Sequence, residues 1–217
     1  MDLKKLIGSF NIKKFSKASR TDFGVFKVAL MVAALDGEVT DAEYRALDAL
    51  AKKCRGYTPK AAAKALDEAM RSAGYLMLLS RRAKDAVLVS AFVEEAQAAL
   101  PYGFAFFSTE DVRRAVVTWV AMGMSDGDYS ARERKCIEAL RKLFAELKVG
   151  RVEAEASANG PFRVSPAYRP VPGCAPCDDS CCVSRDFVKR VEQLVAQYGD
   201  TAEAAKELKD LIAAEPA

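Results

Sequence analysis

The chain has 217 residues, of which 51% are hydrophobic and 29% charged, a composition typical of a folded protein with one sizeable core. It contains no histidine, which excludes Ser-His-Asp and Cys-His catalytic sites and zinc or haem held by histidine. The net charge is +3, but residues 1–20 hold six basic residues and one acid, leaving 27 basic and 29 acidic residues elsewhere. The body is therefore close to neutral, and binding to nucleic acid is not expected.

The chain begins with a basic segment, "MDLKKLIGSFNIKKFSK", in which apolar residues recur at helical spacing between lysines. We expect a helix over residues 3–15 that docks on its own domain, because an apolar stripe on one helical face commonly belongs to a core. The alternative is peripheral contact with an anionic membrane. The segment lacks the apolar run of a signal peptide, and no stretch is apolar enough for a membrane span, so we expect a cytoplasmic protein.

Abundant alanine and apolar residues at three- and four-residue spacing predict an all-α fold, and strand-like alternation is rare. After the N-terminal helix, the pattern predicts helices over residues 22–35, 41–55, 59–72, 76–100, 109–125 and 131–148. These seven helices are expected to form one helical domain over residues 1–150.

The composition changes at about Gly150. Residues 151–183 contain most of the prolines and lack a helical period, so they are expected to be a Pro/Cys-rich linker. Residues 184–217 are predicted to form a C-terminal helical segment that begins at Ser184, breaks at Gly199 and resumes after Thr201. Its first helix has an apolar stripe that cannot be buried alone, so it packs on the body or on a protein partner.

One short pattern occurs twice. "ALDGEVTDAE" (residues 34–43) and "MSDGDYSARE" (residues 124–133) both read Asp-Gly-acid, then a hydroxyl residue and a glutamate three positions later. A hydroxyl residue followed by such a glutamate is a capping box at the start of a helix, and glycine tolerates the positive φ of a helix end. Two such helix–loop–helix hairpins predict a bundle with approximate internal two-fold symmetry.

Capping leaves the acids around each glycine unexplained, because an acid at the C-terminal end of a helix opposes its dipole by about 0.3–1 kcal/mol. Carboxylate oxygens are the ligands that Ca²⁺ and Mg²⁺ prefer. If the hairpins face each other, four carboxylates converge and two more lie at the rim. The convergent set is Asp36, Glu43, Asp126 and Glu133, and the rim set is Glu38 and Asp128. The spacing is not that of an EF-hand, which has its glycine at loop position 6.

The two "DG[ED]xx[ST]xxE" loops, each between an apolar helix and an amphipathic one, resemble those of the tellurite-resistance TerB-like family over about residues 20–150. The resemblance implies an all-helical domain that binds divalent metal in a stress-response system and has no enzymatic activity. Carried over to this chain, the implied metal ligands are Asp36 and Glu43 in the first loop, with Asp126 and Glu133 in the second. The family offers no counterpart for the chain beyond Gly150.

Four of the six cysteines lie close together in "CAPCDDSCC": Cys174, Cys177, Cys181 and Cys182. Four thiolates suit zinc, but adjacent cysteines do not easily chelate one ion, and zinc ribbons bring paired cysteines from distant segments. Copper(I) binding, thiol redox chemistry, a disulfide and no defined site are the alternatives.

Three functions remain open. The first is a non-enzymatic divalent-metal-binding module of a bacterial stress-response system. The second is an interaction scaffold or defence-system component whose loops are only capped turns and whose C-terminal helices bind a protein partner. TerB-like domains also occur joined to J-domains, but the His-Pro-Asp motif cannot occur here, so a chaperone link would need another chain. The third, least favoured, is a thiol redox enzyme. The oligomeric state is not predicted.

Overall fold

The structure is a computed structural model that describes residues 20–53, 59–100, 109–156, 183–199 and 201–214. Over these residues the chain is all-helical, with eight helices and no strand. The helices are α2 (Arg20–Val32), α3 (Asp41–Lys53), α4 (Pro59–Arg82), α5 (Asp85–Ala99), α6 (Thr109–Gly123), α7 (Ala131–Ala156), α8 (Arg185–Tyr198) and α9 (Ala202–Ala214). The helix expected over residues 3–15 and the clustered cysteines lie outside the described residues.

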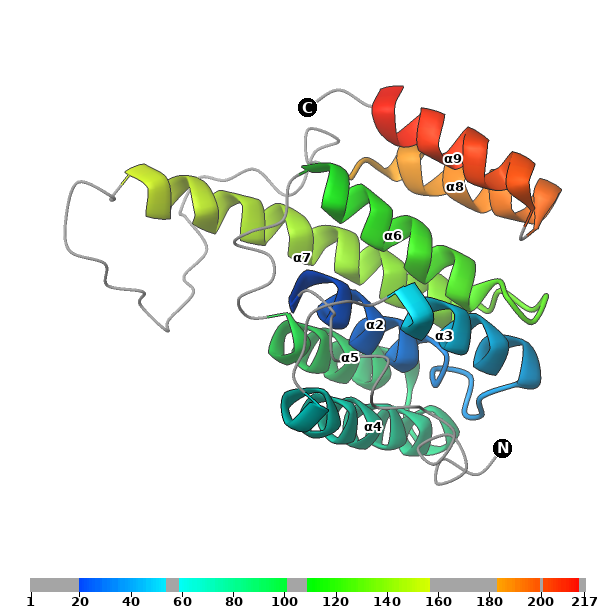
Figure 1. Cartoon of the computed structure of the whole chain (residues 1–217). Coiled ribbons are helices and arrows are strands. Elements are labelled where there is room, and N and C mark those ends of the chain that lie inside the picture. Colours follow the sequence, from blue (N-terminus) through cyan, green and yellow to red (C-terminus); the bar gives the residue numbers. More distant parts are fainter. Residues whose placement is uncertain (1–19, 54–58, 101–108, 157–182, 200, 215–217) are drawn as a thin grey trace.

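Helix α2 is the central helix and contacts α3, α4, α5 and α6 (Figure 1). The helix and the turn that follows it are apolar on nearly every side, and all residues from Val28 to Leu35 are buried. A helix that is hydrophobic on all sides must be buried, so other helices surround it. The indole N–H of Trp119 on α6 donates to the backbone carbonyl of Val25 at 2.9 Å, which fixes α6 against α2.

The α4–α5 hairpin differs from the sequence expectation. Two helices over residues 59–72 and 76–100 imply a break at residues 73–75, but α4 continues to Arg82 and the chain turns at Ala83 and Lys84. Glycine inside a helix costs only about 1 kcal/mol relative to alanine, and Gly74 has open space around it. Burial of Leu76 and Met77 offsets that cost, so the helix persists.

Helix α7 also ends later than expected. It continues to Ala156, past the ends predicted at residues 148 and 150. The residues after Gly150, "RVEAEA", are mostly good helix formers and outweigh the single glycine.

Residues 185–214 form a helical hairpin, α8–α9, with the predicted boundaries. The Ser184 hydroxyl accepts from the Phe187 amide at 3.0 Å, and the Thr201 hydroxyl accepts from the Ala204 amide at 3.1 Å. Gly199 ends α8 with a positive φ of 59°. Each is a helix-boundary role that the sequence predicts for these residues.

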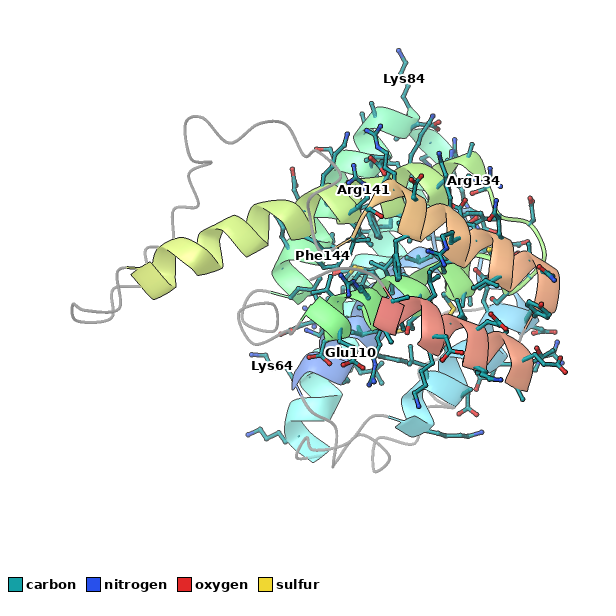
Figure 2. All side chains as sticks on the ribbon, turned by 90° about the horizontal axis from the view of Figure 1, so that it is seen from above. Lys64, Lys84, Glu110, Arg134, Arg141 and Phe144 are labelled. Atoms are coloured by element: carbon teal, nitrogen blue, oxygen red, sulfur yellow. The ribbon has the colours of Figure 1, made fainter. Side chains whose placement is uncertain are left out.

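The α8–α9 hairpin packs on α6 and shares the core of the bundle (Figure 1). Its buried apolar residues are Phe187, Val188, Val191, Ala204, Leu211 and Ile212. Two buried arginines donate to backbone carbonyls at the ends of this segment. Arg113 donates to the carbonyl of Ile212 at 3.3 Å. Arg141 of α7, which lies beside the start of α8 (Figure 2), donates to the carbonyl of Val183 at 3.5 Å. The apolar stripe of α8 is therefore engaged within the chain. No helix among the described residues has the length and apolarity that crossing a bilayer requires.

Candidate metal centre

The two loops that carry the repeated pattern lie at one end of the bundle (Figure 1). The first connects α2 to α3 and the second connects α6 to α7. Both turn at the glycine after the aspartate, where Gly37 has φ 102° and Gly127 has φ 87°. A side chain is strained at such φ values, which explains glycine at both positions.

The hydroxyl and glutamate of each loop form the predicted capping box. In the first loop the Glu43 amide donates to Thr40 Oγ1 at 3.2 Å, and the Thr40 amide donates to Glu43 Oε2 at 2.8 Å. In the second, the corresponding bonds between Ser130 and Glu133 measure 3.2 and 2.7 Å. These bonds satisfy amides at the starts of α3 and α7 that otherwise lack partners.

The aspartates also make a local hydrogen bond that the capping pattern does not predict. Oδ1 of Asp36 accepts from the Glu38 amide at 3.2 Å, and Oδ1 of Asp126 accepts from the Asp128 amide at 2.9 Å. Aspartate commonly bonds the amide two residues on and so stabilises a turn. Each aspartate is thus explained in part by the turn that it forms.

The loops bring three predicted ligands together. Asp36, Glu43 and Asp126 each present a carboxylate oxygen, and these oxygens all lie within 4.8 Å of one another. Asp36 is exposed, Asp126 is half-buried and only 1% of Glu43 is exposed. The group therefore extends from the surface into the bundle and includes residues of both loops.

The fourth predicted ligand, Glu133, is not part of this group of three, but it lies close enough for the charges of both aspartates to act on it. Only 2% of it is exposed, and this burial raises the pKa of its carboxyl group, with the charges of Asp36 and Asp126 acting in the same direction. Glu38 and Asp128 are exposed and contribute their backbone amides to the aspartate turns. The structure thus groups three of the six predicted acids, with Glu133 close by. We call Asp36, Glu43, Asp126 and Glu133 the acidic cluster.

Burial and mutual repulsion raise the pKa values of the acidic cluster. Burial raises the pKa of Glu43 to about 8, and the charges of Asp36 and Asp126 act in the same direction against the hydrogen bonds from Thr40. Burial likewise raises the pKa of Glu133 to about 7. The pKa of Asp36 is raised by burial and by the charge of Asp126. Without a cation, the cluster therefore favours protons on its buried glutamates.

Two arginines hold the loops against the α4–α5 corner. Arg81 donates from Nε and Nη2 to the Gly37 carbonyl at 2.9 and 2.5 Å. Arg132, between Ser130 and Glu133, donates to the Ser80 carbonyl at 2.6 Å and to Asp85 at 2.9 Å. The sequence pattern does not predict these contacts, because they join residues that are distant along the chain.

The repeated loop pattern also does not predict the packing of Gly123 and Tyr129 at this site. A Cβ on Gly123 would lie 3.1 Å from both Glu133 Oε1 and the Tyr129 ring, so a larger residue at the end of α6 would require one of these side chains to shift. The Tyr129 ring also lies under the Arg134 guanidinium, 4.9 Å from its centroid. A glycine in the apolar run "AVVTWVAMGM" was the available signal for close packing.

These features describe an all-helical bundle protein in which two acidic loops meet at one end. A family model described as "Tellurite resistance protein TerB" matches residues 23–155, and the chain belongs to this family. The matched region contains both loops, whereas the α8–α9 hairpin lies beyond it. No curated protein and no solved structure gives a match to this chain.

Proposed function

We propose that the protein is a non-enzymatic module that binds a divalent metal ion between its two acidic loops. The observation that carries this proposal is the approach of carboxylate oxygens from Asp36, Glu43 and Asp126 to within 4.8 Å of one another. When these acids from separate loops are ionised together with Glu133, their charges repel one another, and a cation offsets that repulsion.

The donor set fits a hard divalent ion. In each loop, hydrogen bonds engage Oδ1 of the aspartate and Oε2 of the glutamate. The other oxygen of each carboxyl group takes no part in these bonds, so the turns and caps need not open for a metal to bind. An all-oxygen set favours Ca²⁺, Mg²⁺ or Mn²⁺ over softer ions that prefer thiolate or imidazole.

Family membership indicates the biological role of the proposed metal-binding module. TerB-family membership supports a role connected with tellurite resistance or a related stress response. In that role the bound ion would fix the two loops relative to each other, and Asp36, Glu43, Asp126 and Glu133 would hold it. The thiolate zinc site at Cys174–Cys182 remains a separate prediction, because those residues lie outside the described ones.

The alternative is an interaction scaffold with purely structural loops. The capping boxes explain Thr40, Glu43, Ser130 and Glu133, and the aspartate turns supply a reason for the remaining acids of the acidic cluster. Neither the capping boxes nor the aspartate turns require the two loops to meet. Under this alternative, the loops keep their geometry without metal and added ions leave stability unchanged.

The two functions are separated by a thermal-unfolding titration of the full chain with Ca²⁺, Mg²⁺ and Mn²⁺. The test variant is Asp36→Asn with Asp126→Asn, because asparagine Oδ1 can still accept the backbone amide while the charge is removed. The matched control is Glu38→Gln with Asp128→Asn, which removes two charges at the rim. Metal binding predicts a rise in melting temperature that the control retains and the test variant loses. An equal response in all three proteins contradicts it.

A further inference from the structure

The corner between α4 and α5 is hydrogen-bonded to both acidic loops. The guanidinium of Arg81 donates to the carbonyl of Gly37 in the first loop, from Nε at 2.9 Å and from Nη2 at 2.5 Å. The guanidinium of Arg132, which directly follows the second loop, donates from Nη1 to the carbonyl of Ser80 at 2.6 Å. Ser80 and Arg81 are neighbours in the last turn of α4, so consecutive residues of the corner bind the two loops.

Asp85 adds a second attachment for the second loop. It is the first residue of α5, and its Oδ1 accepts from Nε of Arg132 at 2.9 Å. Its Oδ2 accepts from Nζ of Lys135 at 2.7 Å, one turn further along α7. Arg132 thus joins a main-chain carbonyl at the end of α4 to a carboxylate at the start of α5, and it uses two nitrogens of one planar group to do so.

The first loop is packed closely against the same corner. Gly37 is buried, and a Cβ at its position would lie 3.0 Å from Ser80 Oγ and 3.2 Å from Arg81 Cγ. Ser80 is itself buried, and its hydroxyl donates to the carbonyl of Met77 at 2.9 Å. The corner therefore limits how closely the first loop can approach, while the hydrogen bonds from Arg81 keep the loop from moving away.

Each of these contacts lies one residue from a proposed metal ligand. Gly37 follows Asp36, and Arg132 precedes Glu133, so a displacement of either contact would move a carboxylate of the acidic cluster. Arg132 is not part of the repeated pattern, because Ala42 occupies the corresponding position of the first loop. The first loop forms its capping box and its aspartate turn without an arginine there, so these local structures do not explain Arg132.

We propose that the α4–α5 corner is a clamp that sets the separation of the two acidic loops, with Arg81 and Arg132 as positioning residues for the ion. This inference rests on the proposed function. Each arginine acts through the loop that it holds, and the carboxylates of the acidic cluster remain the ligands. Hydrogen bonds that hold metal ligands in place commonly contribute about 10- to 100-fold to metal affinity.

The positions and the charges of these arginines predict opposite effects on ion binding. A positive charge beside the acidic cluster repels a cation, so removal of the charge alone would strengthen ion binding. Loss of a positioning contact would weaken ion binding, because the carboxylates of the two loops would no longer be held together. A contact that only stabilises the fold would lower the melting temperature and leave the ion affinity of the folded protein unchanged.

The clamp is tested by calorimetric titration of the full chain with Ca²⁺, Mg²⁺ and Mn²⁺, below the melting temperature of every variant. We expect Arg81→Met and Arg132→Met each to weaken ion affinity about tenfold or more. The matched control Arg71→Met removes an exposed arginine from the same helix as Arg81 and should keep the wild-type affinity. Arg81→Lys and Arg132→Lys keep the charge but not the fixed pair of donors, so they should weaken affinity by a smaller factor.

The double variant Arg81→Met with Arg132→Met distinguishes one clamp from two separate anchors. If the corner sets the separation of the loops, either single substitution releases them, and the double variant should bind little more weakly than the weaker of the two single variants. Independent anchors would give losses of binding free energy that add, which would overturn the clamp.

The other outcomes separate the clamp from the proposed function. Ion binding by the wild type with unchanged or stronger affinity in both methionine variants overturns the clamp and leaves the proposed function intact. If the methionine variants do not fold, wild-type affinity in both lysine variants overturns the clamp in the same way. Absence of ion binding by the wild type overturns both.

Discussion

Asp36 and Asp126 belong to different loops, yet their carboxylate oxygens lie within 4.8 Å of each other. Each aspartate also accepts a backbone amide within its own loop, at 3.2 and 2.9 Å respectively. The turns position the carboxylates, and the packing of α2 against α6 brings the turns together. Two like charges held this way are unfavourable without a cation, so the arrangement itself motivates the predictions that follow.

Replacing Gly123 with alanine should disturb the acidic cluster. The added Cβ would lie 3.1 Å from Glu133 Oε1 and from the Tyr129 ring, so one of them must move. We expect a loss of about 1–3 kcal/mol in the free energy of unfolding, the usual cost of overpacking, measured by urea denaturation. Ion affinity should fall in the same variant.

Gly74→Ala is the matched control for that substitution. Gly74 also lies within a helix, but no atom lies within 4 Å of the position that an added methyl group would take. Alanine there should raise stability by about 0.5–1 kcal/mol, because glycine is the poorer helix former. Equal effects at the two glycines would show that the space over Gly123 is not restricted.

Without metal, the free energy of unfolding should fall as pH rises from 5 to 9. The folded-state pKa values of Glu43 and Glu133, about 8 and about 7, lie above the ordinary value of 4.5. Protonation of these groups therefore favours the folded state below pH 4.5, and that contribution is lost as pH rises through 7 and 8. The pKa values of Asp85 and Glu138 are lowered, so these groups change the free energy of unfolding at lower pH than this range.

Urea midpoints in a chelator, measured at several pH values, test this dependence. Glu43→Gln with Glu133→Gln should flatten the decline, since neither side chain then titrates. Saturating Ca²⁺ should reduce the decline in the wild type, because the ion competes with protons for the same oxygens. A wild-type stability that rises over this range is incompatible with buried, mutually repelling glutamates.

The α8–α9 hairpin should behave as an integral part of the fold. Phe187 is fully buried against the bundle, so Phe187→Ala should cost about 3–5 kcal/mol in the free energy of unfolding. Lys189→Ala, two positions away on the exposed face of α8, should change it by no more than about 0.5 kcal/mol. Denaturant unfolding measures both, and a small effect of Phe187→Ala would indicate that the hairpin contributes little to the stability of the bundle.

Local patterns in the sequence predict the features that depend on neighbouring residues. Thr40 with Glu43 and Ser130 with Glu133 predict the capping boxes because both partners lie in the same turn. The aspartate turns are equally local, and an Asp followed by Gly was an available signal for them. The helix break at residues 73–75 was wrong because burial of Leu76 and Met77, a tertiary effect, outweighs the propensity of Gly74.

The meeting of the two loops could be anticipated only from their repetition. The contacts around the loops could not be anticipated, because Arg81 reaches Gly37 and Arg132 reaches Asp85 across large sequence separations. The sequence pattern identified the acids, whereas the structure identifies the residues that hold and surround them.

Whether the two loops share one ion is decided by calorimetric titration of the metal-free full chain with Ca²⁺, Mg²⁺ and Mn²⁺. A shared site predicts one ion per chain for at least one of these metals, and loss of that binding in the Asp36→Asn variant and in the Asp126→Asn variant alike. Two independent ions per chain, each lost with only one aspartate, would contradict it, and so would the absence of binding by all three metals.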